Sequence, residues 1–310
     1  MNLLVTGASG FIGRNLLLDL KEEDVEIDAT YCSDGSFVDF VRDEGLENVN
    51  PVQKNLLNLE LSGLKKQYDT CVFLVSSGSE KKRLMDGFSD LAEFNITAGA
   101  LVNILDKIEF DKFIFMSSGA VYSGLYGEVD PTMDLYPKFP YAVSKFAAEK
   151  YAQMNYYRDR IKHSIIVLRF WGAFGRFEPE WKLASRVIQY IKDGKNGKFR
   201  INGNGENLID PMYIKDAIDG IKRVISSLFP TEDSGIFDFC RGHSISVREY
   251  IKCIAEIIDP DFESFEITYG LDKPIESNDF YALSDSFKRT FNWESNYSIK
   301  QGIKEWQGLV

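Results

Sequence analysis

The chain has 310 residues, with 47 acidic and 36 basic side chains and a formal net charge of −11. That sign disfavours a surface that binds nucleic acid or anionic membranes, because proteins that bind phosphate backbones are usually basic. Hydrophobic residues make up 44% and charged residues 27% of the chain, which is the composition of a folded protein with a hydrophobic core.

The four cysteines are scattered without a paired motif, and the chain has only two histidines. We therefore expect no zinc or other metal site and no disulfide framework. An apolar strand pattern begins at Asn2, and no apolar run reaches about 20 residues, so we expect neither a signal peptide nor a membrane span. The sequence predicts a soluble cytoplasmic protein.

Short apolar runs alternate with helical patterns over the first 172 residues, which is typical of βαβ units and a parallel sheet. After Gly172 glycines interrupt a segment of strand and loop. We therefore predict an α/β protein with a Rossmann-type, doubly wound parallel sheet and a smaller C-terminal lobe. In chain order, the patterns predict a strand at 3–6, a helix at 11–20, strands at 25–31, 50–54 and 70–75, a helix at about 84–107, a strand at 112–117, a helix at 141–158, a strand at 163–171, a helix at 213–228, a strand at 235–240, a helix at 247–258, a strand at 265–269 and a helix at 298–306.

A glycine-rich segment, TGASGFIG at residues 6–13, joins the first predicted strand to the first predicted helix. Its spacing is GxxGxxG and not the GxGxxG of the usual dinucleotide fingerprint. Glycine lets the backbone approach a pyrophosphate at a helix N-terminus, where amide groups and the helix dipole favour negative charge. The flanking strand and apolar helix favour dinucleotide binding over an ordinary βα turn. The residues that we expect to contact the dinucleotide here are Gly7, Gly10, Phe11, Ile12, Gly13 and Arg14.

The end of the second predicted strand bears on the choice between NAD and NADP. An acidic residue there would bind the adenosine ribose and repel a 2′-phosphate. The strand ends at Tyr31 without a carboxylate, and Asp34 lies one or two residues too far along. Arg14 and Ser33 could together hold a 2′-phosphate, although Arg14 is equally explained as an exposed helix residue. The sequence therefore favours NADP over NAD.

Tyr141 and Lys145 lie four residues apart in the predicted helix and so share one face. A lysine close to a phenol lowers its pKa and makes the tyrosine a usable proton carrier. The spacing also occurs by chance, at Tyr269 and Lys273 in this chain. Ser118 ends a predicted strand, and ligands bind at the carboxyl ends of strands in open α/β sheets. Ser118 could therefore bind a reacting oxygen, or it could merely cap a turn.

Four segments occur in an order that resembles the extended short-chain dehydrogenase/reductase family, the NAD-dependent epimerases/dehydratases. They are TGASGFIG (6–13), NITAG (95–99), SSGAVY (117–122) and YAVSK (141–145). Further similarity reaches the C-terminal segment, so the resemblance covers nearly the whole chain. It implies that residues 1–172, with a returning segment at about 208–240, bind NAD(P). Residues 173–207 and 241–310 would form the substrate-binding lobe.

The resemblance also implies the roles of four residues. Tyr141 would be the acid/base, Lys145 would steady it and bind the nicotinamide ribose, and Ser118 would orient the substrate oxygen. Asn95 would support the lysine through water, or it is only a packing residue. The implied reaction is hydride exchange between the nicotinamide and a carbon of a nucleotide-linked sugar.

Departures from the family pattern narrow this expectation. The family's 4,6-dehydratases carry Asp and Glu directly after the catalytic hydroxyl residue, where this chain has Gly119 and Ala120. Dehydration is therefore disfavoured, and reduction of a 4-keto-sugar or C4 epimerisation remains. The missing acid at Tyr31 favours the reductase. A further alternative is a sensor or scaffold that binds NAD(P) without turnover.

The expected substrate contacts are also incomplete. Gly172 replaces the family's asparagine, and Ile209 replaces an arginine that would hold a diphosphate. Lys182 or Arg186 could replace that cation, or either could be a solvated helix residue. The resemblance finally implies a homodimer that pairs the predicted helices at 84–107 and 141–158.

Overall fold

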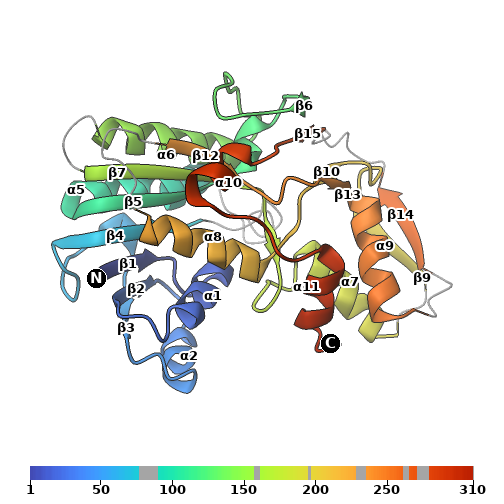
Figure 1. Ribbon diagram of the computed structural model, residues 1–310, viewed down its shortest axis with the longest axis horizontal. Helices are drawn as coiled ribbons and strands as arrows, with labels where there is room; N and C mark the ends of the chain where they lie inside the picture. Colours follow the sequence, from blue (N-terminus) through green and yellow to red (C-terminus); the bar gives the residue numbers. More distant parts are fainter. Residues whose placement is uncertain are drawn as a thin grey trace. The chain divides into compact units, whose positions relative to one another are not determined.

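The computed structural model describes residues 1–76, 90–156, 161–194, 197–227, 235–260, 265–270 and 279–309 (Figure 1). These residues form two compact units. Unit 1 comprises Met1–Ser123, Asp134–Phe170 and Ile221–Phe237, and unit 2 comprises Gly124–Met133, Trp171–Gly220 and Asp238–Val310. The assignment of cofactor binding to the first lobe and substrate binding to the second stays a prediction.

The central sheet has seven strands within the described ranges, in the order β12-β7-β5-β4-β1-β2-β3. Every neighbouring pair from β7 to β3 is parallel. The chain runs outward from β1 through β2 to β3 and then returns to β4 on the other side of β1, which makes the gap between β1 and β4 a switch point where ligands bind. The predicted Rossmann-type fold is confirmed. The strands are β1 (Asn2–Thr6), β2 (Glu26–Tyr31), β3 (Val49–Gln53), β4 (Gln67–Phe73), β5 (Glu109–Ser118), β7 (Ile161–Phe170) and β12 (Gly235–Phe239).

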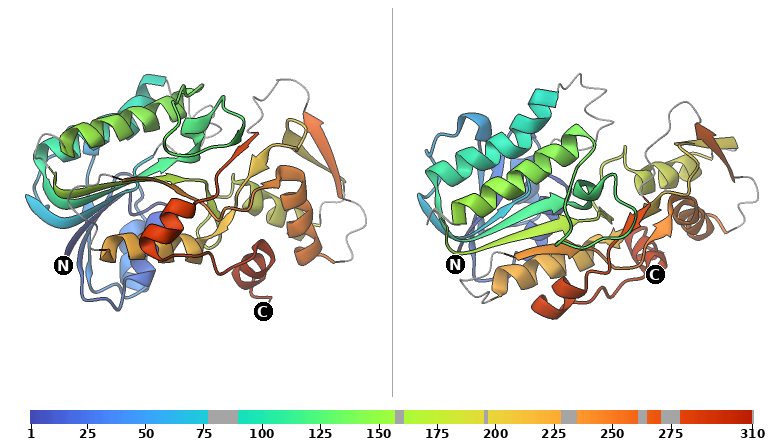
Figure 2. Two further views of the ribbon diagram at one scale, coloured as in Figure 1. Left: turned by 45° about the horizontal axis from the view of Figure 1, so that its top comes forward. Right: turned by 90° about the horizontal axis from the view of Figure 1, so that it is seen from above.

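Helices cover both faces of this sheet, with α5 and α6 on one face and α1 on the other (Figures 1 and 2). Leu101 and Ile104 of α5 belong to the same fully buried cluster as Phe113 and Phe115 of β5. The helices and helical turns around the sheet are α1 (Phe11–Asp19), α2 (Phe37–Asp43), η1 (Leu56–Asn58), α4 (Asp90–Phe94), η2 (Asn95–Gly99), α5 (Ala100–Lys107), η3 (Gly119–Tyr122), α6 (Pro140–Tyr156) and α8 (Ile214–Ser226).

The long helix predicted at 84–107 is interrupted in the part that the structure describes. A π-helical turn, η2, separates α4 from α5. Residues 84–89 of the prediction lie outside the described residues, as do the last residues of the helix predicted at 141–158. The sequence patterns did not indicate α2, because Phe37, Phe40 and Val41 give only one short apolar stripe.

Unit 2 is built from short strand pairs and helices around an aromatic core. The ring centroid of Phe174 lies 5.6 Å from that of Tyr213 and 6.0 Å from that of Tyr250, and the centroids of Phe239 and Trp293 lie 5.4 Å apart.

No helix in the described ranges has both the length and the apolar character to cross a membrane. The strands pair as β6 (Gly127–Glu128) with β15 (Phe280–Tyr281), β8 (Ala173–Phe174) with β11 (Met212–Tyr213), β9 (Gly197–Asn202) with β14 (Phe265–Gly270) and β10 (Leu208–Ile209) with β13 (Ile245–Ser246), and the helices are α7 (Leu183–Lys192), α9 (Val247–Ile258), α10 (Asp285–Phe291) and α11 (Ile299–Trp306).

Candidate active site

The glycine loop turns from β1 into α1 at the switch point of the sheet. Gly7 has a φ of +68°, and a Cβ there would lie 3.2 Å from the backbone of Leu74, just beyond β4. Gly13 lies inside α1, where a Cβ would come within 2.6 Å of the Ala8 Cα. The amide of Ala8 donates to the Thr30 carbonyl at 2.9 Å, which fixes the loop to the end of β2. Glycine is therefore required where the loop and the helix approach each other most closely.

The N-terminus of α1 fits the pyrophosphate of a dinucleotide. Gly10 is the N-cap residue and has no side chain that could compete for the first amides of the helix, and the first turn contains no acidic side chain. A nine-residue helix that presents its amides without a competing carboxylate favours a bound anion. Phe11 and Ile12 begin this helix, so both predicted contact residues lie beside the glycine loop.

Arg14 lies directly after the glycine loop and is held by several groups. Its Nη2 lies 2.7 Å from Oδ2 of Asp34 and 3.1 Å from the Ser36 hydroxyl, and its guanidinium carbon lies 4.5 Å from the centre of the Phe40 ring. Ser33, its predicted partner for a 2′-phosphate, is exposed. Asp34 thus brings a carboxylate to the place where the sequence seemed to lack one.

Ser118 and Tyr141 come together from the end of β5 and the first turn of α6. The Ser118 hydroxyl accepts a hydrogen bond from the Ala120 amide at 3.1 Å, which caps η3, and it also hydrogen-bonds with the Tyr141 phenol. Pro140 is the first residue of α6, a position where its fixed φ suits a helix start. The two hydroxyls predicted to act together are therefore neighbours.

Burial raises the pKa of the Tyr141 phenol above its usual range. Hydrogen bonds with Ser118 and Ser76 lower this pKa, and the nearby Glu93 carboxylate raises it. The sequence predicts that Lys145 lowers the pKa of Tyr141. In the structure the Lys145 Nζ lies 5.9 Å from the centre of the Tyr141 ring, and its hydrogen bonds go elsewhere.

Lys145 is almost fully buried, with 2% of its surface exposed. Its ammonium donates to the Met116 carbonyl at 2.9 Å and to the Val75 carbonyl at 3.4 Å, which lie at the carboxyl ends of adjacent strands. Burial lowers the pKa of Lys145 to about 8, against the charges of Glu93 and Glu149, which raise it. The Lys145 side chain therefore links the ends of β4 and β5 close to the Tyr141 phenol.

One turn after Lys145, the Glu149 carboxylate anchors α6 to two strands. It accepts a hydrogen bond from the Ser117 hydroxyl at 2.5 Å and forms two with Arg169 of β7, at 3.2 and 2.9 Å. Arg169 also donates to the Tyr122 hydroxyl at 2.9 Å. All four side chains are at most 3% exposed, so this network fixes the helix that carries Tyr141.

Asn95 lies in the π-helical turn η2. Its side chain lines a groove of about 540 Å³ between helices, together with Phe94, Gly99 and Tyr151. Its role as a support of Lys145 through water stays a prediction.

The sequence patterns did not indicate two residues at this site. Ser76 lies three positions beyond β4 and belongs to no sequence motif. Glu93 lies in α4, and because a π-helical turn follows α4, the apolar pattern of the sequence does not show that Glu93 faces inward. Glu93 is 1% exposed, and its charge acts on both Tyr141 and Lys145. The position of Ser76 at the carboxyl end of a central strand is the one signal that could have indicated it.

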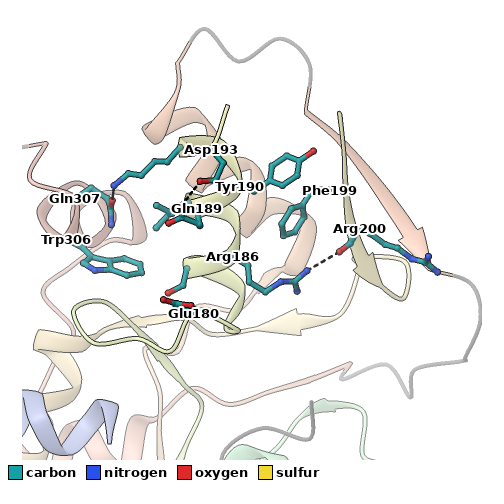
Figure 3. A pocket seen from close by; sticks show the side chains of 12 residues that line it. Glu180, Arg186, Gln189, Tyr190, Asp193, Phe199, Arg200, Trp306 and Gln307 are labelled. Carbon is teal, nitrogen blue, oxygen red and sulfur yellow. Dashed lines mark hydrogen bonds between the residues drawn. The ribbon is translucent and has the colours of Figure 1, made fainter. Parts of the chain in front are cut away.

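Unit 2 contains a separate pocket of about 820 Å³ between α7, β9 and the end of α11 (Figure 3). Its walls include Arg186, Arg200 and Trp306. The Arg186 guanidinium carbon lies 5.1 Å from the centre of the Phe199 ring, and Nη2 lies 3.4 Å from the Arg200 carbonyl. The lining thus contains the cations Arg186, Lys192 and Arg200, the carboxylates Glu180 and Asp193, and aromatic surface. Within the described residues, no cluster of three or more His, Cys, Asp or Glu side chains could hold a metal.

The model of the NAD dependent epimerase/dehydratase family matches residues 3–238, which include the glycine loop and the three residues at the ends of β5 and α6. The chain belongs to this family. An uncharacterized UDP-glucose epimerase of Bacillus subtilis, YtcB, is 28% identical over 237 residues, which cover 73% of this chain and 72% of the relative.

Other relatives cover nearly the whole chain. The dTDP-D-glucose 4,6-dehydratase of Mus musculus is 25% identical over 98% of this chain and 86% of its own length. The crystal structure of UDP-glucuronic acid 4-epimerase from Bacillus cereus, in complex with UDP-glucuronic acid and NAD, is 20% identical, covers both chains completely and has a TM-score of 0.85. That likeness shows the fold of the family over the full length.

Proposed function

We propose that this protein is an NAD-dependent nucleotide-sugar epimerase or 4-keto-sugar reductase. The observation that carries the proposal is the hydrogen bond between the Tyr141 phenol and the Ser118 hydroxyl, close to the buried Lys145. These groups lie at the carboxyl ends of the sheet strands, as does the glycine loop. Relatives that act on or bind nucleotide sugars support the substrate class.

The roles of the residues follow from their positions. Ser118 orients the reacting sugar oxygen by hydrogen bonding, and Tyr141 exchanges a proton between its phenolic oxygen and that sugar oxygen. Lys145 adds positive charge near the phenol, and Gly7, Gly10 and the N-terminus of α1 hold the pyrophosphate of the dinucleotide. The bound nicotinamide would supply or accept the hydride.

We propose NAD and not NADP as the cofactor. The Asp34 carboxylate pairs with Arg14. Burial raises the pKa of Asp34, but hydrogen bonds from Ser36 and Arg14 and the charge of Arg14 outweigh burial and keep this pKa below its usual range, so the carboxylate is charged at neutral pH. A fixed negative charge at the end of β2 disfavours a 2′-phosphate. The sequence-based preference for NADP, which assigned a 2′-phosphate to Arg14 and Ser33, is not supported, because a solved neighbour binds NAD and Arg14 is paired with Asp34.

Dehydration remains the less favoured chemistry, although a dehydratase is among the relatives. The backbone of Gly119 and Ala120 forms the capped turn η3, and neither residue carries a group that can move a proton. Formation of a dehydrated sugar product would favour the dehydratase alternative.

We propose that unit 2 binds the nucleotide portion of the substrate through its own pocket. Arg186 offers charge for phosphates, and Trp306 offers a surface for stacking. Loss of Arg186 should then raise the KM for the nucleotide sugar much more than it lowers kcat.

We also propose that a second copy of the chain covers the groove beside Asn95. Leu91 and Phe94 are 68% and 42% exposed there, and Val143 of α6 is 43% exposed. Light scattering during size-exclusion chromatography should show a dimer, and Phe94→Asp should convert it to a monomer. A wild-type monomer at micromolar concentration would exclude this arrangement.

The test of the activity combines product analysis with one matched pair of variants. UDP-glucose, UDP-glucuronic acid and dTDP-glucose are incubated with the protein, with and without added NAD(H), and the products are separated. An epimerase needs no added cofactor, whereas a reductase consumes reduced cofactor in proportion to product. Tyr141→Phe should abolish turnover, and Tyr136→Phe, at a tyrosine that is 71% exposed, should not. Full turnover by Tyr141→Phe would refute the proposal, and no turnover of any sugar would favour a sensor.

A further inference from the structure

Two serine hydroxyls reach the Tyr141 phenol from neighbouring strands of the sheet. Ser118 ends β5, and Ser76 follows the end of β4, which pairs in parallel with β5 from Tyr68↔Phe110 through Phe73↔Phe115. Both hydroxyls hydrogen-bond with the phenol. The phenolic oxygen is therefore held from two sides, and only one of these partners belongs to a motif of the chain.

The Lys145 ammonium fixes the backbone on which both serines stand. It donates to the carbonyl of Val75, which directly precedes Ser76, and to the carbonyl of Met116, two residues before Ser118. Since Tyr141 and Lys145 occupy one face of α6, a single helix contacts both strand ends. The placement of Ser76 beside the phenol is thus part of a rigid arrangement of three elements.

We propose that Ser76 is a second positioning residue of the acid/base site, which donates a hydrogen bond to the Tyr141 oxygen and favours its phenolate form. This inference rests on the proposed function of Tyr141. Two donors on one phenolate stabilise its charge more than one, which matters where burial disfavours that charge. With Ser76 bound to the phenol, the Ser118 hydroxyl can turn toward the substrate and the Tyr141 oxygen still keeps one hydrogen bond.

The charged groups that face the phenol act in opposite directions. The Lys145 ammonium lies on the same helix, and the buried Glu93 carboxylate approaches from α4. Removal of the Ser76 hydroxyl leaves both charges in place and removes one hydrogen bond to the phenolate. The phenol of Ser76→Ala should therefore ionise at higher pH than that of the wild type.

The test measures this ionisation directly, without any substrate. Protein labelled with ¹³C at the tyrosine Cζ is titrated by NMR, and the Tyr141 resonance is assigned by its absence from Tyr141→Phe. We expect the midpoint of Tyr141 to rise by about one pH unit in Ser76→Ala and to return toward the wild-type value in Ser76→Thr. Ser62→Ala, at an exposed serine before β4, is the matched control and should leave the midpoint unchanged.

The same variants are also compared by steady-state kinetics, with the substrate that the product analysis identifies. In Ser76→Ala we expect kcat to fall about tenfold with KM nearly unchanged, and the limb of the pH profile that needs phenolate to move to higher pH. An unchanged Tyr141 midpoint in Ser76→Ala would overturn the role of Ser76, as would a failure of Ser76→Thr to restore it in folded protein. Neither result touches the proposed function, which fails only if Tyr141→Phe remains active.

Discussion

Arg14 and Asp34 form a 2.7 Å ion pair between the start of α1 and the segment after β2. The side chains are 14% and 34% exposed, so solvent only partly screens the pair. The guanidinium carbon of Arg14 also lies 4.5 Å from the centre of the Phe40 ring, which is a cation–π contact. We expect this pair to decide which charge meets the adenosine ribose, because it joins a cation and a carboxylate at the predicted ribose site.

Asp34→Asn should therefore change the cofactor preference. With the carboxylate neutralised, Arg14 can pair with a 2′-phosphate, and we expect the Kd of NADP to fall and the Kd of NAD to rise, each by about tenfold. Isothermal titration of cofactor-free protein measures both constants. Asp39→Asn, at a carboxylate of α2 that is 60% exposed and pairs with Arg42, is the control. An unaltered ratio of the two constants in Asp34→Asn would contradict the assignment.

A second prediction concerns the buried Glu149–Arg169 pair. Glu149→Ala leaves the Arg169 guanidinium buried without its carboxylate, so we expect the free energy of unfolding to drop by about 3–5 kcal/mol. Replacement of both residues by methionine removes both buried charges and should recover much of that loss. Urea denaturation followed by circular dichroism compares the variants. Equal stability of the single and double variants would show that the pair is not the source of the effect.

Much of this site could be predicted from the sequence because its parts are local. The glycine loop needs only a strand, a turn and a helix, and Tyr141 and Lys145 share a helix face through their spacing alone. The Arg14–Asp34 pair could not be predicted in this way. The loop that carries Asp34 after Tyr31 has to fold back over α1 before the carboxylate reaches the guanidinium, and no sequence pattern specifies that path.

The fold shows the same division. The parallel sheet follows from the alternation of apolar strands with helices, and its order is as expected for that class. The helix α2 was missed because it has only one short apolar stripe, and α7 was missed because the glycines after Gly172 favoured strand and loop in that segment. Ser76 was missed for another reason, since a lone serine acquires meaning only when the tertiary fold brings Tyr141 to it.

A third prediction tests the glycine loop. In Gly13→Ala the new Cβ would lie 2.6 Å from the Ala8 Cα, so α1 and the loop must separate. We expect NAD affinity to fall at least tenfold and the melting temperature to drop by several degrees, since overpacking at a rigid contact costs about 1–3 kcal/mol. Gly35→Ala is the control, because a Cβ there meets open space. Wild-type affinity in Gly13→Ala would mean that the close contact is unimportant for the dinucleotide.

A fourth prediction uses the pKa of Lys145, which burial lowers to about 8 from its ordinary value of 10.5. Between these values the unfolded chain binds the proton and the folded chain does not, so the contribution of Lys145 to stability rises with pH in that window. The stability of cofactor-free wild type, relative to Lys145→Met, should increase by up to about 3 kcal/mol from pH 8 to 10.5. Denaturation at four pH values measures this difference. A constant difference would indicate that the ammonium stays charged throughout.

The π-helical turn at Asn95–Gly99 has a consequence for the acid beside the phenol. A π-helical turn contains one more residue than an α-helical turn. The side chains of α4 are therefore rotated about the helix axis by roughly a quarter of a revolution relative to those of α5. Glu93 on the near side and Leu101 on the far side both point inward at 1% and 0% exposure. Deletion of Thr97 would restore a regular helix and swing the Glu93 carboxylate out toward water, while Leu101 kept its place against the strands. One inserted residue thus sets the electrical environment of the proton carrier.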